Sequence, residues 1–292
     1  MLKLRAYAKI NLSLDVVGKL ENGYHELCMV MHTVKLYDII TITEKKNGGI
    51  RMTTNLPYLP ANRNNLVMRA AELFFEHSRI VAPNLHIHLK KYIPVGAGLA
   101  GGSSDAAAVL RGLNEQYGRK LSRAELMEIG KTLGADVPYC IMGGTALAEG
   151  IGEKLTPLPR MPKCYIVLAK PKFSLSTPAV FGETDLPNMK LHPDTRGMLE
   201  AIRQHDLKEI AVRMFNVLEE PAKKVIQKQN ANWCSPLIIN EYKRTMLKYN
   251  SIGTVMSGSG PTVFGLFIKE EDAQEAYRRF RQMTPDTFLT TT

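Results

Sequence analysis

The feature that most constrains this chain is a glycine-rich stretch, PVGAGLAGGSSDAAA, at residues 94–108. It places four glycines within seven residues, between a strand-like segment at 85–91 and a segment whose apolar residues recur at helical spacing. Glycines let backbone N–H groups approach an anion, and the start of a helix adds further N–H groups. A plain strand-to-helix turn with Ser103 as the N-cap would need fewer glycines. The stretch therefore predicts a phosphate-binding loop.

Two common phosphate-binding motifs do not explain this stretch. A P-loop ends in Gly-Lys followed by Ser or Thr, which does not occur in it. Gly96, Gly98 and Gly101 match the G-x-G-x-x-G pattern of dinucleotide-binding folds, but the preceding strand has only one apolar face and leads into a proline. The remaining possibility is a Gly/Ser-rich loop that surrounds the nucleotide phosphates from one side. The phosphates would then also lie at the N-terminus of a helix that begins near Asp105.

Composition narrows the class of partner. The 292 residues are 45% hydrophobic and 23% charged, as in ordinary folded proteins. The net charge of +10 raises nucleic acid or a membrane surface as partners, but the basic residues never run beyond two together and do not alternate with aromatic residues. We therefore expect small anionic ligands, and neither nucleic acid nor membrane as a partner.

Two further features indicate a cytoplasmic protein. No signal-peptide core and no apolar run of 18 residues occur in the sequence. The four cysteines lie far apart, without a C-x-x-C pair, and are expected to be reduced thiols: Cys28, Cys140, Cys164 and Cys234.

The first half of the chain is rich in strand patterns. Residues 8–16 alternate strictly between apolar and polar, which predicts a strand with one buried face and with Lys9 and Asn11 projecting together from the other. A turn is expected at 21–24 (ENGY), a helix at 64–77, and a second helix from Ser122 to about Leu133, closed by Gly134. Further strands are expected at 27–36, 38–44, 50–54 and 85–91.

A proline-rich stretch, LTPLPRMP at 155–162, predicts a boundary between two domains, 1–157 and 158–292. The part before this boundary has the pattern of an α+β fold without regular βαβ repeats. The expected elements of the second part are a strand at 164–169, helices between 194 and 249, a strand at 252–256, a glycine turn, a strand at 262–268, a helix at 270–282 and a last strand.

Three motifs together resemble the GHMP kinases, the superfamily named for galactokinase, homoserine, mevalonate and phosphomevalonate kinases. They are YAKINLSLDVVGKLENGYHEL at 7–27, the glycine-rich stretch, and MSGSGPTVFGLF at 256–267. The resemblance implies a two-domain α+β fold, with a β-rich N-terminal domain like ribosomal protein S5 and a ferredoxin-like C-terminal α/β sandwich. It also implies ATP as co-substrate, with Mg²⁺.

Within that superfamily, the segments NGYH, GLAGGSSDAAA and GADVP are most similar to the members that phosphorylate the 2-hydroxyl of 4-diphosphocytidyl-2-C-methyl-D-erythritol, a cytidine diphosphate-linked polyol of the non-mevalonate isoprenoid pathway. The alternatives are a relative acting on mevalonate or homoserine, and a nucleotide-binding protein without catalysis. A monomer or weak homodimer is expected.

From the residues alone, Lys9 is a solvated strand charge and Asp136, in GADVP, is an N-cap for the turn that contains Pro138. The resemblance instead implies that both are catalytic, with Lys9 beside the hydroxyl being phosphorylated and Asp136 as the base that takes its proton.

The resemblance also implies the binding residues. The ATP-binding set is Pro94, Val95, Gly96, Ala97, Gly98, Leu99, Ala100, Gly101, Gly102, Ser103 and Ser104, with Asn65 and Leu66 near the adenine. The acceptor set is Asn11, Tyr24, His25, Thr177 and Phe181, in which Tyr24 and Phe181 would stack on the cytosine and His25 would contact its edge. Ser103 or Ser104 is the candidate Mg²⁺ ligand; the remaining metal ligands are unknown.

Overall fold

The computed structural model describes residues 1–21, 23–229 and 235–292, so Asn22 of the expected turn and Cys234 lie outside the described residues. The chain forms two compact units. Unit 1 comprises Met1–Ala8, Leu36–Ile93 and Ala100–Gly143, and unit 2 comprises Lys9–Lys35, Pro94–Leu99 and Gly144–Thr292. The predicted division into 1–157 and 158–292 concerns family domains rather than these units, and it stays a prediction.

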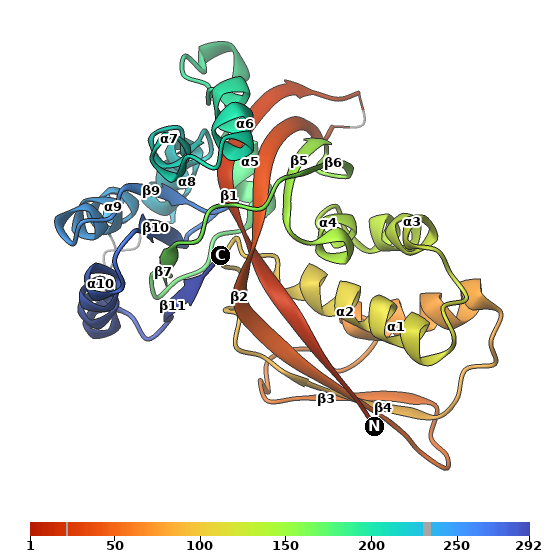
Figure 1. Ribbon diagram of the computed structural model, residues 1–292. Coiled ribbons are helices and arrows are strands. Elements are labelled where there is room, and N and C mark those ends of the chain that lie inside the picture. The colour runs from red at the N-terminus through yellow and green to blue at the C-terminus, as the bar shows by residue number, and fades with distance from the viewer. Residues whose placement is uncertain (22, 230–234) are drawn as a thin grey trace. The chain divides into compact units, whose positions relative to one another are not determined.

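Unit 1 packs helices against one face of a sheet, and Figure 1 shows α1 and α2 beside β3 and β4. Strand β2 is antiparallel to β4, with Ile39 opposite Lys90, and β3 is parallel to β4. The elements that lie in unit 1, wholly or in part, are β1 (Leu2–Lys19), β2 (His25–Glu44), β3 (Ile50–Thr54), α1 (Leu66–Ser78), β4 (Leu85–Lys90), α2 (Gly101–Gln116), α3 (Arg123–Leu133) and α4 (Val137–Met142).

The core of unit 1 follows the hydrophobic patterns of these elements. Inward-facing residues of β2 and β4, such as Ile40 and Ile87, pack with Phe74 of α1 and Leu110 of α2, and all four are fully buried. Helix α3 begins and ends where the sequence predicts: Ser122 and Glu125 form a reciprocal capping box at its start, and Gly134 is its C-cap. The two expected strands at 27–36 and 38–44 are one continuous strand, β2.

Unit 2 contains an antiparallel sheet in the order β11-β7-β10-β9, with helices α9 and α10 packed on it (Figure 1). Tyr242 of α9 and Phe280 of α10 meet edge to face, with ring centroids 5.0 Å apart. Its further elements are β5 (Thr145–Gly150), β6 (Lys154–Leu158), β7 (Tyr165–Ala169), α5 (Thr177–Gly182), a 3₁₀ turn (Leu186–Asn188), α6 (Thr195–Arg203), α7 (Leu207–Val212), β8 (Phe215–Asn216), α8 (Glu219–Lys228), α9 (Ile238–Lys248), β9 (Gly253–Met256), β10 (Val263–Phe267), α10 (Glu270–Met283) and β11 (Thr287–Thr291).

The proline-rich stretch is more regular than expected. Strand β6 includes Pro157 and, among the described strands, pairs with β5 alone, which suits a residue that cannot donate a ladder hydrogen bond. Strand β5 in turn pairs with the first part of β2, with Leu27 opposite Gly150. Residues 155–158 of the predicted boundary are therefore part of a regular strand.

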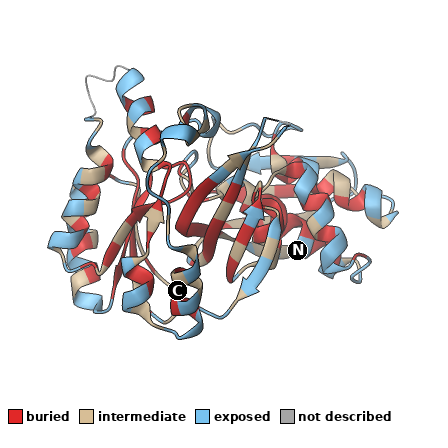
Figure 2. Cartoon of the chain, turned by 90° about the horizontal axis from the view of Figure 1, so that it is seen from above, coloured by how far each residue is buried: buried red, intermediate tan, exposed pale blue. Residues whose placement is uncertain are grey.

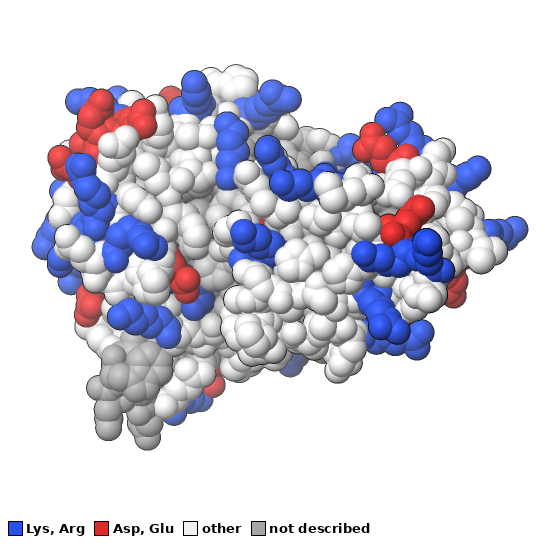
Figure 3. Space-filling view, turned by 90° about the horizontal axis from the view of Figure 1, so that it is seen from below, with Lys and Arg blue, Asp and Glu red and all other residues white. Residues whose placement is uncertain are grey.

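Burial and charge follow the usual pattern of a folded protein. Figure 2 shows surface helices buried along one side and exposed along the other. Figure 3 shows one face of the molecule, on which Lys and Arg are interspersed with Asp, Glu and uncharged residues. Among the described residues, no helix is both long enough and apolar enough to span a membrane. Cys28, Cys140 and Cys164 form no disulfide bond.

Candidate active site

Strand β1 buries polar side chains on the face that was expected to be exposed. Lys9 is 4% exposed and Asn11 is fully buried, and the Lys9 Nζ donates a hydrogen bond to Asn11 Oδ1 at 2.8 Å. Ser13 and Asp15 on the same face are buried as well. The expectation of one buried face is therefore wrong, because the side chains on both faces are buried from Ala8 to Val16. Burying an ammonium is costly, so this face is a candidate for function.

The glycine-rich loop, residues 94–99, contacts the third motif within unit 2. Gly98 has a φ of +74°, and a Cβ there would lie 2.1 Å from the Ser257 carbonyl oxygen. The Ser257 hydroxyl donates to the Gly98 carbonyl oxygen at 2.9 Å. Gly98 is therefore required by the backbone contact between two loops, a reason that sequence alone does not supply.

The first motif meets both loops. The Lys9 backbone N–H donates to the Leu99 carbonyl oxygen at 3.2 Å. A Cβ on Gly258 would lie 3.4 Å from the Lys9 Nζ, so the loop backbone comes close to the ammonium. Asn216 fixes this loop by donating from Nδ2 to the carbonyl oxygens of Met256 and Gly258, at 2.7 and 2.8 Å. Parts of the three motifs, which lie far apart in sequence, thus converge in unit 2.

The rest of the loop rests on the segment before α5. A Cβ on Gly96, which has a φ of +62°, would lie 3.0 Å from the Ser174 side chain, and the Ser174 hydroxyl donates to the Val95 carbonyl oxygen at 3.2 Å. Ala97 is buried, whereas Val95 is 41% exposed and Pro94 is half-buried. Residues 94–99 therefore form an ordered loop that is supported by its neighbours in unit 2.

Helix α2 begins earlier than predicted. It starts at Gly101 rather than near Asp105, so Gly102, Ser103 and Ser104 lie in its first turn. Its N-cap is Ala100, with φ and ψ of 55° and 31° and without a side-chain cap, so the alternative of a plain turn with Ser103 as the N-cap is wrong. A left-handed alanine is strained, and strain of this kind concentrates at functional sites. An uncapped start leaves helix N–H groups for an anion.

A buried ion cluster in unit 1 lies beneath this helix start, and sequence reasoning missed it. The Lys91 Nζ donates to a carboxylate oxygen of Asp38 and, at 2.8 Å, to Asp105 Oδ2. Burial acts to lower the pKa of Lys91, but the carboxylates of Asp105 and Asp38 prevail and raise it. Burial raises the pKa of Asp105 well above its usual range, opposed by Lys91.

Asp136 lies in unit 1 at the N-cap position of α4, with Pro138 in the first turn. The position is the one expected for a cap, but the Asp136 side chain makes no capping hydrogen bond. Its carboxylate is therefore not explained by the helix end, which weakens the interpretation of Asp136 as a simple cap.

Asn65 and Leu66, the predicted adenine residues, lie at the start of α1 in unit 1. Asn65 is the N-cap: its Oδ1 accepts from the Val67 N–H at 3.0 Å and its Nδ2 donates to the Pro60 carbonyl oxygen at 2.9 Å. Leu66 lies 3.7 Å from the position of a Cβ on Gly102. Both polar atoms of the Asn65 side chain therefore hold the backbone at the start of α1. A contact of Asn65 with adenine stays a prediction.

All five predicted acceptor residues belong to unit 2, and two of them, His25 and Phe181, are in contact. The rings of His25 and Phe181 stack with centroids 5.2 Å apart and an interplanar angle of 27°. Burial and the nearby Lys19 lower the pKa of His25. Tyr24 is 61% exposed. The hydroxyls of Thr177 and Ser259 are 2.8 Å apart, which links the start of α5 to the third motif.

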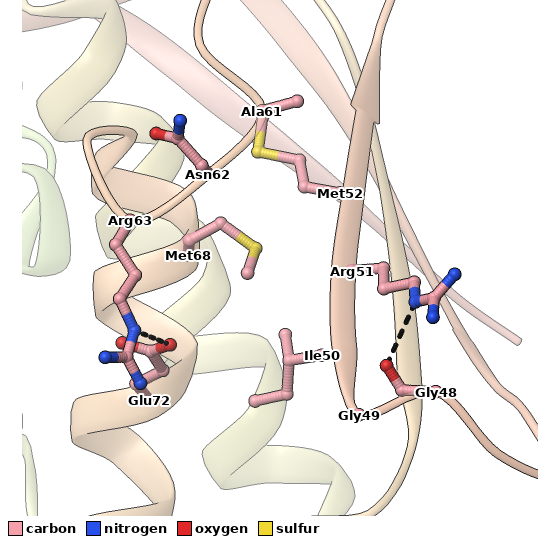
Figure 4. Close-up of a pocket in the computed structure, with 10 residues that line it drawn as sticks. All are labelled: Gly48, Gly49, Ile50, Arg51, Met52, Ala61, Asn62, Arg63, Met68 and Glu72. Atoms are coloured by element: carbon pink, nitrogen blue, oxygen red, sulfur yellow. Dashed lines mark hydrogen bonds and ion pairs between the residues drawn. The ribbon is translucent and has the colours of Figure 1, made fainter.

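A separate cavity of about 710 Å³ lies between β3 and the start of α1 (Figure 4). Met52 and Met68 line it, and an ion pair of 2.9 Å joins Arg63 to Glu72 at its side. None of the predicted site residues lines this cavity. It is therefore not part of the candidate active site.

A magnesium site made only of protein groups is not found. The described residues include no cluster of three or more His, Cys, Asp or Glu side chains. Mg²⁺ with nucleotides usually takes one or two protein ligands plus phosphate oxygens and water, which fits a single hydroxyl in the first turn of α2. The Ser104 hydroxyl donates to the Tyr7 carbonyl oxygen at 2.6 Å, so Ser103 is the better candidate of the two.

Comparisons with known proteins agree with this architecture. The chain matches the family model of the GHMP kinases N terminal domain over residues 65–144 and that of the GHMP kinases C terminal domain over residues 198–286. It is 45% identical to a 4-diphosphocytidyl-2-C-methyl-D-erythritol kinase of Alkaliphilus metalliredigens, covering 98% of this chain and 95% of that protein.

Solved structures give the same result. The chain is similar to a crystal structure of 4-(cytidine 5′-diphospho)-2C-methyl-D-erythritol kinase, with a TM-score of 0.80 and 32% identity, covering 99% of this chain and 98% of that one. It shares the fold of a homoserine kinase from Cytophaga hutchinsonii, with a TM-score of 0.75, 19% identity, and coverage of 100% and 94%.

Proposed function

Because the chain belongs to the GHMP kinases, and among them to the 4-diphosphocytidyl-2-C-methyl-D-erythritol kinases, we propose that it transfers the γ-phosphoryl group of ATP to the 2-hydroxyl of 4-diphosphocytidyl-2-C-methyl-D-erythritol. This reaction belongs to the non-mevalonate pathway to isoprenoid precursors. The observation that carries the proposal is 45% identity to a relative of that name over 98% of this chain. Identity to the homoserine kinase is only 19%, so that alternative is less supported.

Phosphate binding is assigned to the glycine-rich loop and the start of α2. The helix has sixteen residues, no acidic residue in its first turn and no side-chain cap, so its dipole and N–H groups favour an anion. The remaining ATP-binding residues, from Pro94 to Ser104 with Asn65 and Leu66, are proposed on the family motif.

We assign charge stabilisation to Lys9 and proton removal to Asp136. The Lys9 ammonium is held by Asn11 in a buried environment, where a fixed positive charge acts strongly on a transferring phosphoryl group. Phosphoryl transfer has a loose transition state, so positioning and charge matter more than the strength of the base. Mg²⁺ supplies charge neutralisation when it is bound with ATP, and Ser103 is the proposed ligand.

Cytosine recognition is assigned to Tyr24, His25 and Phe181, with Thr177 close by. One face of Phe181 lies against the His25 ring, so the stacking unit available to a base is an aromatic pair plus the exposed Tyr24 ring.

A cytoplasmic location and a monomeric or weakly dimeric state are further proposals. Size-exclusion chromatography with light scattering measures the oligomeric state.

The test is ADP release from ATP and Mg²⁺ with three acceptors offered separately: 4-diphosphocytidyl-2-C-methyl-D-erythritol, mevalonate and homoserine. We expect turnover with the first alone. Turnover with mevalonate or homoserine at a similar rate would overturn the acceptor assignment, and ATP binding without turnover of any acceptor would favour a non-catalytic nucleotide-binding protein.

A further inference from the structure

We propose that Asp38, Lys91 and Asp105 form a buried clamp that joins the two stems of the glycine-rich loop and so sets its geometry for ATP, with Asp105 as a positioning residue. The first stem is 91–93 and the second is 101–105, and both stems lie in unit 1. The inference rests on the proposed function, in which this loop binds ATP.

The first stem is held by one carboxylate. Asp38 is fully buried, and its Oδ1 accepts hydrogen bonds from the backbone N–H groups of Tyr92, at 2.5 Å, and Ile93, at 2.8 Å. Its other oxygen accepts from the Lys91 ammonium. Three consecutive residues that lead into the loop are thereby fixed to a single side chain of β2. A carboxylate that accepts several hydrogen bonds defines the backbone position more closely than apolar packing does.

The second stem is attached through the same ammonium. The Lys91 Nζ donates to Asp105 Oδ2 at 2.8 Å, across the gap between the end of β4 and the second turn of α2. Gly101 allows this approach, because a Cβ there would lie 3.0 Å from both the Lys91 Nζ and the Ile93 Cγ2. The helix start is therefore packed directly on the clamp.

All three charged side chains of the clamp are buried, and a contribution to stability alone does not explain this. Lys91 is 4% exposed at its side chain, and the two carboxylates are 0% and 3% exposed. Replacing a buried ion cluster with apolar residues of similar volume is often neutral or stabilising, so stability gives little reason to keep one. A role in positioning does explain the cluster, because its directional hydrogen bonds fix the two stems relative to each other. Small displacements of a binding loop reduce its complementarity to the ligand.

The test compares three variants of the full chain by calorimetry with a non-hydrolysable ATP analogue and, separately, with the cytidyl acceptor. Asp105→Leu removes the link but leaves Lys91 paired with Asp38. Asp105→Asn keeps an oxygen that can accept from Nζ. Asn114→Ala is the matched control: Asn114 is a buried polar residue at the other end of α2, bonded to the backbone of Leu121 and not to either stem.

We expect Asp105→Leu to raise the Kd for the ATP analogue about tenfold or more while the Kd for the acceptor changes less than about twofold. Asp105→Asn should recover most of the affinity, and Asn114→Ala should lower stability without changing either Kd. If Asp105→Leu does not fold, Asp105→Ser takes its place, because its side chain is too short to reach Nζ.

Two results would overturn the clamp: an unchanged Kd for the ATP analogue in folded Asp105→Leu or, in its place, Asp105→Ser, or equal losses of affinity for both ligands in that variant. Failure of the wild-type chain to bind the analogue would instead refute the proposed function, so the two failures are distinguishable.

Discussion

The substitution Gly98→Ala tests whether the contact between the glycine-rich loop and the third motif holds the candidate site together. The added Cβ would begin 2.1 Å from the Ser257 carbonyl oxygen and must reach at least 3.0 Å. That movement breaks the hydrogen bond from the Ser257 hydroxyl to Gly98 and the one from the Gly260 N–H to Ser257, both 2.9 Å long. At about 1 kcal/mol each, plus about 1 kcal/mol for an alanine at positive φ, the free energy of unfolding should fall by about 3 kcal/mol.

The matched control is Gly144→Ala, also in unit 2. Gly144 has a φ of +79°, close to the +74° of Gly98, but a Cβ there would meet nothing within 4 Å. The control therefore carries only the backbone cost of about 1 kcal/mol. The difference between the two variants isolates the contact between the loops.

Thermal unfolding by circular dichroism measures this difference. A further 2 kcal/mol should place the Tm of Gly98→Ala about 4–8 °C below that of Gly144→Ala. In calorimetry, Gly98→Ala should also lose more affinity for ATP than for the cytidyl acceptor, because the loop is displaced. Equal Tm values for the two variants, or equal losses for both ligands, would refute the reasoning.

Three further predictions concern single side chains. Asp136→Asn should keep the fold and the affinity for ATP but reduce kcat by about 10²- to 10⁴-fold, as expected for a positioned base; single-turnover kinetics within a few-fold of wild type would exclude that role. Tyr24→Ala should raise the KM of the cytidyl acceptor by an amount equivalent to about 1–3 kcal/mol while Tyr24→Phe changes it little; an unchanged KM would contradict stacking on cytosine. Burial lowers the pKa of His32 to about 4, so its neutral form stabilises the fold fully above the unfolded value of 6.5 and this stability is lost as pH falls toward 4. His32→Gln should therefore lose less stability than wild type between pH 6.5 and 4 in urea titrations, and identical pH profiles would show that His32 does not contribute.

Local signals predicted some elements closely. Helix α3 has the expected ends because Ser122, Glu125 and Gly134 determine them within a few residues. The start of α2 was predicted four residues late, because its N-cap is a left-handed alanine, which sequence rules for capping do not anticipate. Sequence rules for capping do not predict the ends of helices that depend on tertiary contacts.

The same distinction applies to the candidate site. The motifs predicted Lys9 and the glycine-rich loop as site residues, but the burial of the polar face of β1 from Lys9 to Asp15 depends on segments far away in sequence. Lys91 has the pattern of a solvated charge at the end of a strand, and only the fold brings Asp38 and Asp105 to it. Ion pairs between distant segments produce no periodic pattern in a single sequence, so sequence patterns cannot predict them.

The path of the chain through its two units has a consequence for recombination between relatives. Unit 2 takes Lys9–Lys35 and Pro94–Leu99 from the first half of the chain and all its other residues from Gly144 onward. A chimaera joined at 157/158 would therefore inherit the Lys9 strand and the Gly98 loop from one parent, and the Ser257 loop that packs against Gly98 from the other. Substitutions at Gly98 and Ser257 must be compatible with each other, so these loops are expected to be exchanged as a set.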